Sequence, residues 1–268
     1  MPRPPIDGGV VLVTGASSGI GRAIVRTLGG RPRAVAVTAR RTERLEELKR
    51  ELEGAHPDLR VLVVPCDLGD RVATDRMLES VHAELGPVDV LVNNAGFGDF
   101  GPYDRAPWSK TADMIELNIT TLAYLTHRVL PGMVERGRGG VLNVSSGFGL
   151  QFLPGFAAYV GTKHFVTGFT ESLRLDLAGT GVAVTQLCPG PVDTEFVERA
   201  RMGRTLPFQF TKISAERCAR AAVRGFDAGR AMVIPGLMMK FILLLGALTP
   251  RFLLRLIYRP VAAVIRRM

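Results

Sequence analysis

The chain has 268 residues, enough for one large domain or two ordinary ones, and no linker, repeat or low-complexity run divides it. Its net charge is +9, but seven bases and no acid follow Asp227, so the preceding body is nearly neutral and does not suit general nucleic-acid binding. The three cysteines and four histidines are scattered, which predicts neither a disulfide framework nor a metal site.

Seven short apolar runs alternate with helical patterns along the chain. Such runs are typical of strands buried on both faces of a parallel sheet. They are Val10–Val13, Ala34–Thr38, Arg60–Val64, Val88–Val92, Gly140–Val144, Val182–Leu187 and Ala231–Ile234. The alternation predicts an α/β fold: a single doubly wound Rossmann-like domain over residues 1–234, with a seven-stranded parallel sheet and helices on both faces.

The first run leads into a glycine-rich turn, after which a helical pattern begins. A strand, a flexible turn and a helix suit a dinucleotide, because the backbone can approach the pyrophosphate and the helix N-terminus offers N–H groups. A plain βα turn is the alternative for glycines taken alone. The residues expected to contact the cofactor are Gly15, Ser17, Ser18, Gly19, Ile20 and Gly21.

The second run ends in two arginines, Arg40 and Arg41. An NAD site needs a carboxylate about 20 residues past the glycines, to bind the ribose 2′-hydroxyl. A guanidinium instead pairs with a phosphate through its charge and its two donors. We therefore predict NADP(H), with Arg40 as the stronger candidate. The alternative is that both arginines only begin a solvated helix, which Arg41 in particular suits because an amphipathic pattern opens at Thr42.

Ser146, Tyr159 and Lys163 form the most informative motif of the chain. Tyr159 and Lys163 are four residues apart and project from one helix face, while Ser146 stands at the end of the fifth run. A phenol has a pKa of about 10 in water, and a neighbouring ammonium should lower that pKa. The Ser146 hydroxyl can hold a substrate oxygen beside the phenol, which predicts a proton-donating site.

The TGxxxGxG turn, the segment Asn93-Asn94-Ala95-Gly96 and this Ser/Tyr/Lys set together resemble the short-chain dehydrogenase/reductase family, from Val10 to about Thr194. The resemblance implies that Asp67 contacts the adenine and that Asn118 holds a water linking Lys163 to solvent. It also implies that the turn after the sixth run holds the nicotinamide carboxamide. The further expected cofactor contacts, with Tyr159 and Lys163, are Leu68, Asn94, Ala95, Gly96, Pro189, Gly190, Val192 and Thr194.

The resemblance implies an NADP(H)-dependent oxidoreductase that interconverts a carbonyl and a secondary alcohol. Ser146 is expected to bind the carbonyl oxygen, Tyr159 to act as general acid or base, and Lys163 to tune Tyr159 and bind the nicotinamide ribose. A catalytically silent NADP(H)-binding sensor or scaffold is the alternative. The intact set Ser146, Tyr159, Lys163 and Asn118 favours the enzyme.

Large apolar side chains flank the catalytic motifs. If they face the cleft, they predict an apolar pocket for a lipid-like, steroid-like or aromatic ketone; the alternative is core packing. The candidates are Phe97, Phe148, Phe152, Leu153, Phe156 and Phe196.

Residues 235–268 form an apolar and basic C-terminal extension. Its run Phe241–Leu248 is too short for a bilayer span, which needs about 20 residues, and Pro260 is expected to break or kink a helix. We expect helical segments that join subunits, attach to an anionic membrane surface or form a lid over the cleft. One helical stripe carries Arg251, Arg255, Arg259 and Arg266.

The N-terminus has no apolar signal segment, which predicts a cytoplasmic enzyme, at the inner face of the membrane if the extension binds lipid. We expect a small-molecule carbonyl or alcohol substrate and a homo-oligomer, either dimer or tetramer. No nucleic-acid partner is expected.

Overall fold

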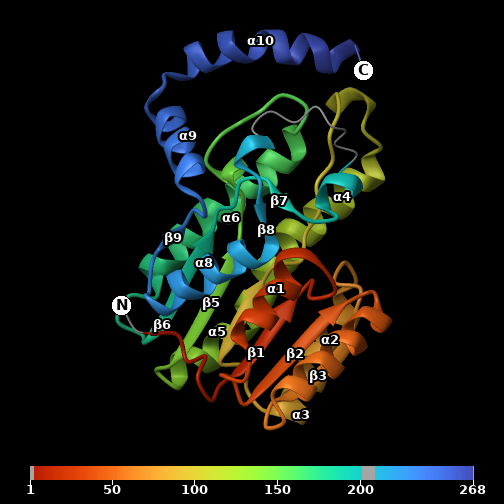
Figure 1. Ribbon diagram of the computed structural model, residues 1–268, viewed down its shortest axis with the longest axis vertical. Coiled ribbons are helices and arrows are strands. Elements are labelled where there is room, and N and C mark those ends of the chain that lie inside the picture. The colour runs from red at the N-terminus through yellow and green to blue at the C-terminus, as the bar shows by residue number, and fades with distance from the viewer. Residues whose placement is uncertain (1–2, 201–208, 268) are drawn as a thin grey trace.

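Seven parallel strands form the central sheet in the computed structural model, which describes residues 3–200 and 209–267 (Figure 1). Their order is β3-β2-β1-β4-β5-β6-β9. The predicted sheet is confirmed, and each predicted run matches one strand to within two residues. The strands are β1 (Val10–Thr14), β2 (Ala34–Ala39), β3 (Arg60–Pro65), β4 (Val90–Asn93), β5 (Gly139–Val144), β6 (Val182–Leu187) and β9 (Met232–Val233).

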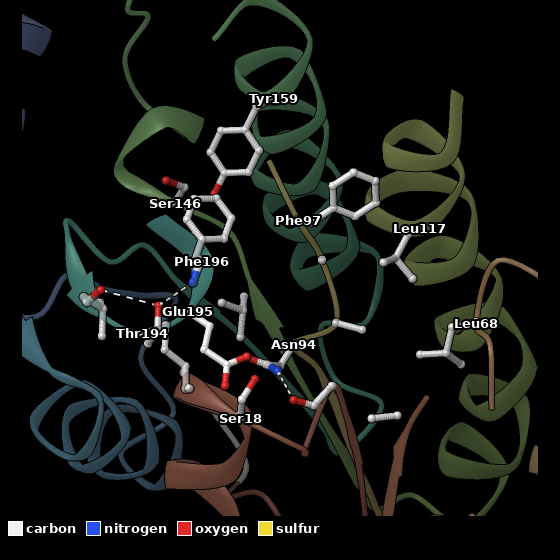
Figure 2. A pocket seen from close by; sticks show the side chains of 18 of the residues that line it. Ser18, Leu68, Asn94, Phe97, Leu117, Ser146, Tyr159, Thr194, Glu195 and Phe196 are labelled. Atoms are coloured by element: carbon white, nitrogen blue, oxygen red, sulfur yellow. Dashed lines mark hydrogen bonds between the residues drawn. The ribbon is translucent and has the colours of Figure 1, made fainter. Parts of the chain in front are cut away.

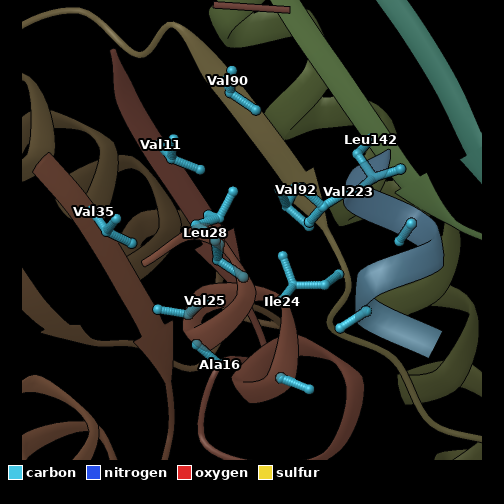
Figure 3. Close-up of a cluster of buried hydrophobic side chains, with 14 of the residues drawn as sticks. Val11, Ala16, Ile24, Val25, Leu28, Val35, Val90, Val92, Leu142 and Val223 are labelled. Atoms are coloured by element: carbon cyan, nitrogen blue, oxygen red, sulfur yellow. The ribbon is translucent and has the colours of Figure 1, made fainter. Parts of the chain in front are cut away.

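Helices cover both faces of this sheet, as the pattern predicted. Successive side chains of a strand point to opposite faces, so Val11 packs in one apolar cluster and Leu12 in the other. The first cluster, with Ile24, Leu142 and Val223, is shown in Figure 3. One face is covered by α1 (Gly19–Leu28), α2 (Thr42–Ala55) and α8 (Ala215–Asp227), and the other by α3 (Arg71–Leu85), α5 (Leu122–Glu135) and α6 (Ala157–Asp176).

The strand order reverses direction between β1 and β4, which places a crevice at their carboxyl ends. Thr14 joins the two strand ends there. Its hydroxyl donates to the carbonyl of Val92 at 3.2 Å and accepts from the amides of Asn94 at 2.9 Å and Ala95 at 3.0 Å. The segment that follows β4 is therefore held against the glycine-rich turn that follows β1.

Several short elements lie above the carboxyl edge of the sheet. Strands β7 (Val192–Asp193) and β8 (Ile213–Ser214) pair in a second, small parallel sheet that the sequence did not predict. Two-residue strands are too short to show a periodicity, so no pattern indicates them. The others are η1 (Tyr103–Arg105), α4 (Trp108–Ile115), the π-helix η2 (Glu116–Thr121), η3 (Gly147–Gly149), α7 (Phe196–Arg199) and η4 (Gln209–Thr211).

The C-terminal extension is helical, as predicted, and consists of α9 (Leu237–Leu248) and α10 (Arg251–Arg267). Of the break or kink predicted at Pro260, the break is wrong: α10 runs through Pro260, and the chain turns at Pro250. A kink at Pro260 remains a prediction. A proline disfavours the helical conformation of the residue before it, and Thr249 has an extended backbone (φ −82°, ψ 125°). At Pro260 the unpaired carbonyl one turn earlier belongs to exposed Leu256, where water can satisfy it.

Among the described residues, no single helix is long and apolar enough to cross a membrane. The pair α9 and α10 meets that length and composition together, with a bend of 118° between the two helices.

Candidate active site

A cleft of about 990 Å³ opens at the carboxyl ends of the strands (Figure 2). Its walls come from the glycine-rich turn, the ends of β2, β4 and β5, the start of α6 and the segment after β6. The structure therefore brings together motifs that lie far apart in the sequence, at the edge where parallel strands present their loops.

The glycine-rich turn forms one end of the cleft. Gly15 has φ +67°, and a Cβ there would lie 2.8 Å from Asn94 Nδ2 and 2.9 Å from Ala95 Cα. The Asn94 amide donates to the carbonyls of Thr14 at 2.9 Å and Gly15 at 3.2 Å. Only a glycine leaves room for this approach, so the turn is fixed against the end of β4.

The turn leads into the N-terminus of α1, where Ser17, Ser18, Gly19 and Ile20 line the cleft. Within the described part of the chain the Ser18 side chain makes no capping hydrogen bond, so it leaves the first amides of α1 to a ligand. Gly21 does not line the cleft: a Cβ there would lie 2.6 Å from the Gly15 carbonyl, so its place is where α1 packs on the turn.

The two arginines after β2 lie differently. Arg40 lines the cleft with a side chain 72% exposed and 4.0 Å from Asp67. Arg41 reaches across the turn and donates to the hydroxyls of Ser17 at 3.1 Å and Ser18 at 2.8 Å. Both arginines therefore line the cleft, and Arg41 does more than begin α2 because it also holds the glycine-rich turn.

Glu195 was not predicted, yet it lines the same end of the cleft. Its carboxylate accepts from Arg41 at 2.8 Å and from Arg44. Arg44 and Arg41 lower the pKa of Glu195 to about 2, so it carries a negative charge at neutral pH. The charge of Arg41 is already shared with this carboxylate. No sequence signal could pair residues 41 and 195.

Asp67, Leu68, Ala95 and Gly96 line the wall expected to hold the adenosine. The Leu68 carbonyl accepts from the Thr121 hydroxyl at 2.6 Å, which fixes the loop after β3. Asp67 is largely exposed and accepts from the Gly69 amide at 3.1 Å. Its second carboxylate oxygen faces Arg40.

Ser146, Tyr159 and Lys163 meet at the other end of the cleft, with Ser146 and Tyr159 facing each other in Figure 2. The Ser146 hydroxyl accepts from the Phe148 amide at 3.1 Å, which holds it at the start of η3. Lys163 Nζ donates to the Val144 carbonyl at 2.8 Å and lies 5.8 Å from the centroid of the Tyr159 ring. The neighbouring Ser145 hydroxyl donates a hydrogen bond to the Lys163 carbonyl at 3.1 Å, so it holds the end of β5 against α6.

The pKa of Tyr159 differs from the prediction. Burial raises the pKa of Tyr159 to about 12, and the hydrogen-bonding Ser146 hydroxyl opposes this only in part. Burial also lowers the pKa of Lys163 to about 8. The prediction that Lys163 lowers the pKa of the Tyr159 phenol is therefore wrong. Burial of the phenol raises its pKa by more than the Lys163 ammonium lowers it, because that ammonium donates to the Val144 carbonyl and is itself disfavoured by burial.

Asn118 is buried in the π-helix beside this site. Its side chain accepts from the Phe97 amide at 3.1 Å and donates to the Phe97 carbonyl at 2.9 Å and to the Thr162 hydroxyl at 3.1 Å. The side chain therefore ties the segment after β4 to α6. The water expected at Asn118 remains a prediction.

The segment after β6 closes the cleft, with Pro189, Gly190, Val192 and Thr194 in its lining. The Pro189 carbonyl accepts from the Gly147 amide at 2.8 Å, which joins this segment to the loop of Ser146. The predicted nicotinamide residues are thus adjacent to the catalytic ones.

Only three of the predicted aromatic substrate residues line the cleft: Phe97, Phe148 and Phe196. Phe156 is 1% exposed and packs against Phe100 and Phe148, with ring centroids 4.9 Å and 5.1 Å away. Phe152 packs on Tyr258 of α10 instead, at 5.7 Å, and Leu153 is buried. These three residues were predicted to contact the substrate, but none of them lines the cleft, because Leu153 and Phe156 are buried and Phe152 packs on α10.

Two further residues shape the catalytic end without any signal in the sequence. Met239 of α9 lines the cleft, and a Cβ on Gly147 would lie 2.8 Å from its methyl carbon. Gly98 lets Phe196 approach Tyr159, because a Cβ there would lie 2.8 Å from the Phe196 ring and 3.2 Å from the Tyr159 ring. The extension thus contributes to the cleft wall.

Known proteins resemble this chain over most of its length. The profile of the short chain dehydrogenase family matches residues 9–205. The NADP-dependent 3-hydroxy acid dehydrogenase YdfG of Escherichia coli (strain K12) is 42% identical over 189 residues, which are 70% of this chain and 74% of that protein.

Solved structures of short-chain and alcohol dehydrogenases share the fold. A short-chain dehydrogenase from Sphingobium yanoikuyae in complex with NADPH has a TM-score of 0.80 at 29% identity, covering 89% of this chain and 93% of that one. The bulky-bulky ketone specific alcohol dehydrogenase from Comamonas testosteroni has a TM-score of 0.73 at 27% identity, covering 85% and 86%.

Proposed function

The chain belongs to the short-chain dehydrogenase family, and we propose that it uses NADP(H) to interconvert an apolar ketone and a secondary alcohol. One observation carries the proposal. Ser146, Tyr159 and Lys163 share a single cleft with a turn shaped for a dinucleotide. Its alternative, a silent nucleotide-binding sensor or scaffold, has no need for a buried phenol and ammonium at the catalytic end.

The residues of the cleft fit the cofactor. The backbone of the turn is open to phosphates because Gly15 and Gly19 have positive φ values and Ser18 does not cap α1. Tyr159 and Lys163 would hold the nicotinamide ribose, and the segment from Pro189 to Thr194 the carboxamide. When bound, NADP(H) supplies or accepts the hydride.

The proton chemistry belongs to the protein. In reduction, the Ser146 hydroxyl binds the substrate carbonyl oxygen, and the Tyr159 hydroxyl gives its proton to that oxygen as the alkoxide develops. The high pKa of Tyr159 keeps the phenol protonated at neutral pH, which suits the reductive direction. In oxidation, the phenolate must form first, and a charged Lys163 released from the Val144 carbonyl would favour it.

Charge supports NADP(H) over NAD(H). Arg40 and Arg41 both line the cleft, and we expect them to contact a 2′-phosphate. The carboxylate of Asp67, which is expected at the adenine, faces Arg40. The relative from Escherichia coli is named NADP-dependent, and the Sphingobium structure holds NADPH. We infer the same preference here: the Arg40 side chain is largely exposed and lies 4.0 Å from Asp67, so it can turn toward the phosphate.

An apolar ketone fits the catalytic end better than a charged substrate. Phe97, Phe148, Phe196 and Met239 line it, whereas the basic residues in the described lining other than Lys163 are Arg40 and Arg41, at the phosphate end. A hydroxy acid would place its carboxylate away from both arginines. The relative from Comamonas is named for bulky ketones.

The test is NADPH consumption with a panel of aliphatic, steroid and aromatic ketones and 3-ketoacyl thioesters. We expect turnover by the parent, at least 100-fold less by Tyr159→Phe, and unchanged NADPH binding in that variant, because the ring still packs. Tyr103→Phe, on exposed η1, is the matched control. Near-normal turnover by Tyr159→Phe would remove the role given to Tyr159, and a parent that binds NADPH but reduces no ketone would favour the silent module.

We also infer a homo-oligomer, dimer or tetramer, in the cytoplasm. Exposed Trp108 on α4 and Leu175 on α6 offer apolar contacts outside the cleft, and three buried free cysteines suit a reducing compartment. Light scattering of the purified protein gives the mass in solution, and a monomer at all concentrations would contradict the assembly.

A further inference from the structure

The C-terminal helices α9 and α10 carry an apolar surface that no described element covers, and we propose that it docks on an anionic lipid membrane surface. Leu237, Leu248 and Phe252 are 81%, 73% and 66% exposed. Exposed apolar area of this density is unfavourable in water and marks an interaction surface. The inference concerns binding and does not depend on the proposed reaction.

Helix α9 has two distinct faces. Met239 and Leu243 are buried against the loop of Gly147, four residues apart on one side. At about 100° per residue, the opposite side carries a continuous row of exposed apolar residues. They are Leu237, Phe241, Leu244, Leu245 and Leu248.

Helix α10 divides into three faces at the same spacing. Its inward stripe contains Leu254, Tyr258, Val261 and Ile265, which are buried or half-buried. Tyr258 packs on Phe152, so the stripe is occupied by the body of the protein. The outward face carries the exposed apolar residues Phe252, Leu253, Leu256, Ile257 and Val264.

The third face of α10 is a row of arginines between the inward and outward faces: Arg251, Arg255, Arg259 and Arg266. Arg266 pairs with Asp104, which fastens the end of α10 to η1. No ion pair joins Arg251, Arg255 or Arg259 to a carboxylate in the described ranges. These three arginines therefore offer unpaired positive charge along one edge of the outward apolar face.

An apolar face edged by arginines is the arrangement that an anionic bilayer surface binds. Apolar side chains enter the acyl boundary, and the long arginine side chains reach the headgroups beside them. The absence of any acidic residue in the sequence after Asp227 leaves nothing on the helices to repel the lipid charge. The occupied inward stripe keeps α10 on the surface of the bilayer, with its axis along that surface.

A second copy of the chain fits this surface less well. A two-fold contact places the same patch on both subunits, so two rows of arginines without acidic partners would approach each other. Lipid phosphates neutralise the row instead. Figure 1 shows α10 lying across one end of the molecule, beyond the loops of the cleft, where a flat surface can reach it.

The test is sedimentation of the full-length protein with vesicles. We expect binding to phosphatidylserine–phosphatidylcholine vesicles at low salt, release at high salt and no binding to pure phosphatidylcholine. The triple variant Arg251→Gln, Arg255→Gln, Arg259→Gln should lose about 100-fold in partition, because each base near the surface contributes about fivefold. The control neutralises three exposed arginines of α8: Arg217, Arg220 and Arg224.

A second variant tests the apolar face. Leu256→Ser with Ile257→Ser changes only exposed side chains, so the fold should persist, and binding to anionic vesicles should fall at least tenfold. Val72→Ser, which changes an exposed apolar side chain of α3, is its control. Three results would overturn the proposal: no binding of the parent to anionic vesicles, equal binding by the arginine variant, or a smaller oligomer mass for the serine variant, which would make the surface a subunit contact.

Discussion

Replacing Lys163 by methionine tests how burial governs the catalytic end. Burial places the pKa of Lys163 at about 8, below its ordinary 10.5. Between these values the unfolded chain holds more protons than the folded one, so folding stability rises with pH across this window. Below about pH 8, Lys163 is charged in the folded protein, and the full loss of folding stability caused by burying its ammonium is present. Lys163→Met removes that titration, so the parent should gain stability relative to the variant as the pH rises.

The size of the effect follows from the two pKa values. At about 1.4 kcal/mol per pKa unit, the difference between the two pKa values lowers the free energy of unfolding by about 3 kcal/mol at neutral pH. About 2 kcal/mol of this should be recovered between about pH 7 and about pH 9.5. Tyr159 has the opposite effect, because its pKa of about 12 lies above the ordinary 10. Its contribution to folding stability falls only above about pH 10. The comparison therefore stays below that pH.

Urea unfolding of the nucleotide-free protein, followed by circular dichroism, measures the effect. The stability of Lys163→Met at a single pH is not decisive, because the variant also loses the hydrogen bond to the Val144 carbonyl, worth about 1 kcal/mol or more. The decisive quantity is how the difference between parent and variant changes with pH. Lys49→Met on α2, which removes a lysine outside the cleft lining, is measured beside it as the control. A pH-independent difference for Lys163→Met would refute the reasoning.

Three further substitutions probe the two ends of the cleft. Arg40→Asp should reverse or erase a preference for NADPH over NADH, because it replaces the expected phosphate partner with a repelling charge. Titration of both nucleotides measures the preference, and equal affinities in the parent would contradict the assignment. Glu195→Gln removes the carboxylate that pairs with Arg41, so calorimetry should show several-fold tighter binding of NADPH and little change for NADH. An unchanged NADPH affinity would show that Glu195 does not compete with the cofactor for Arg41. Met239→Trp narrows the cleft wall and should raise KM for bulky ketones more than for small ones, with NADPH affinity unchanged; an equal rise for both would show that Met239 does not face the substrate.

The strands and the catalytic set were predictable because their signals are local. An apolar run marks a buried strand by itself, and the spacing of Tyr159 and Lys163 places both on one helix face whatever the rest of the chain does. The glycine-rich turn is likewise read from consecutive residues. The sheet and the motif positions followed from such patterns, and the parallel arrangement then brought the motifs to one edge.

The residues that the sequence did not reveal depend on distant contacts. Glu195 meets Arg41 across the cleft, and Met239 reaches it from a helix that follows the last strand. Phe148 and Phe156 stand close together in one segment, yet one lines the cleft and the other is buried. Pro260 shows the same dependence, since exposure of the turn before it decides whether a helix tolerates a proline. The division at residue 235 remains a prediction.

Transfer of deuterium is the most direct test of the proposed reaction. The protein is incubated with an apolar ketone and NADPH deuterated on the transferring face of the nicotinamide ring, and the alcohol is analysed by mass spectrometry. The account predicts one deuterium on the carbinol carbon with the parent, and none above background with Tyr159→Phe, which should still bind the nucleotide. An alcohol formed without deuterium from either face of the ring, or nucleotide binding without any alcohol across the ketone panel, would contradict it.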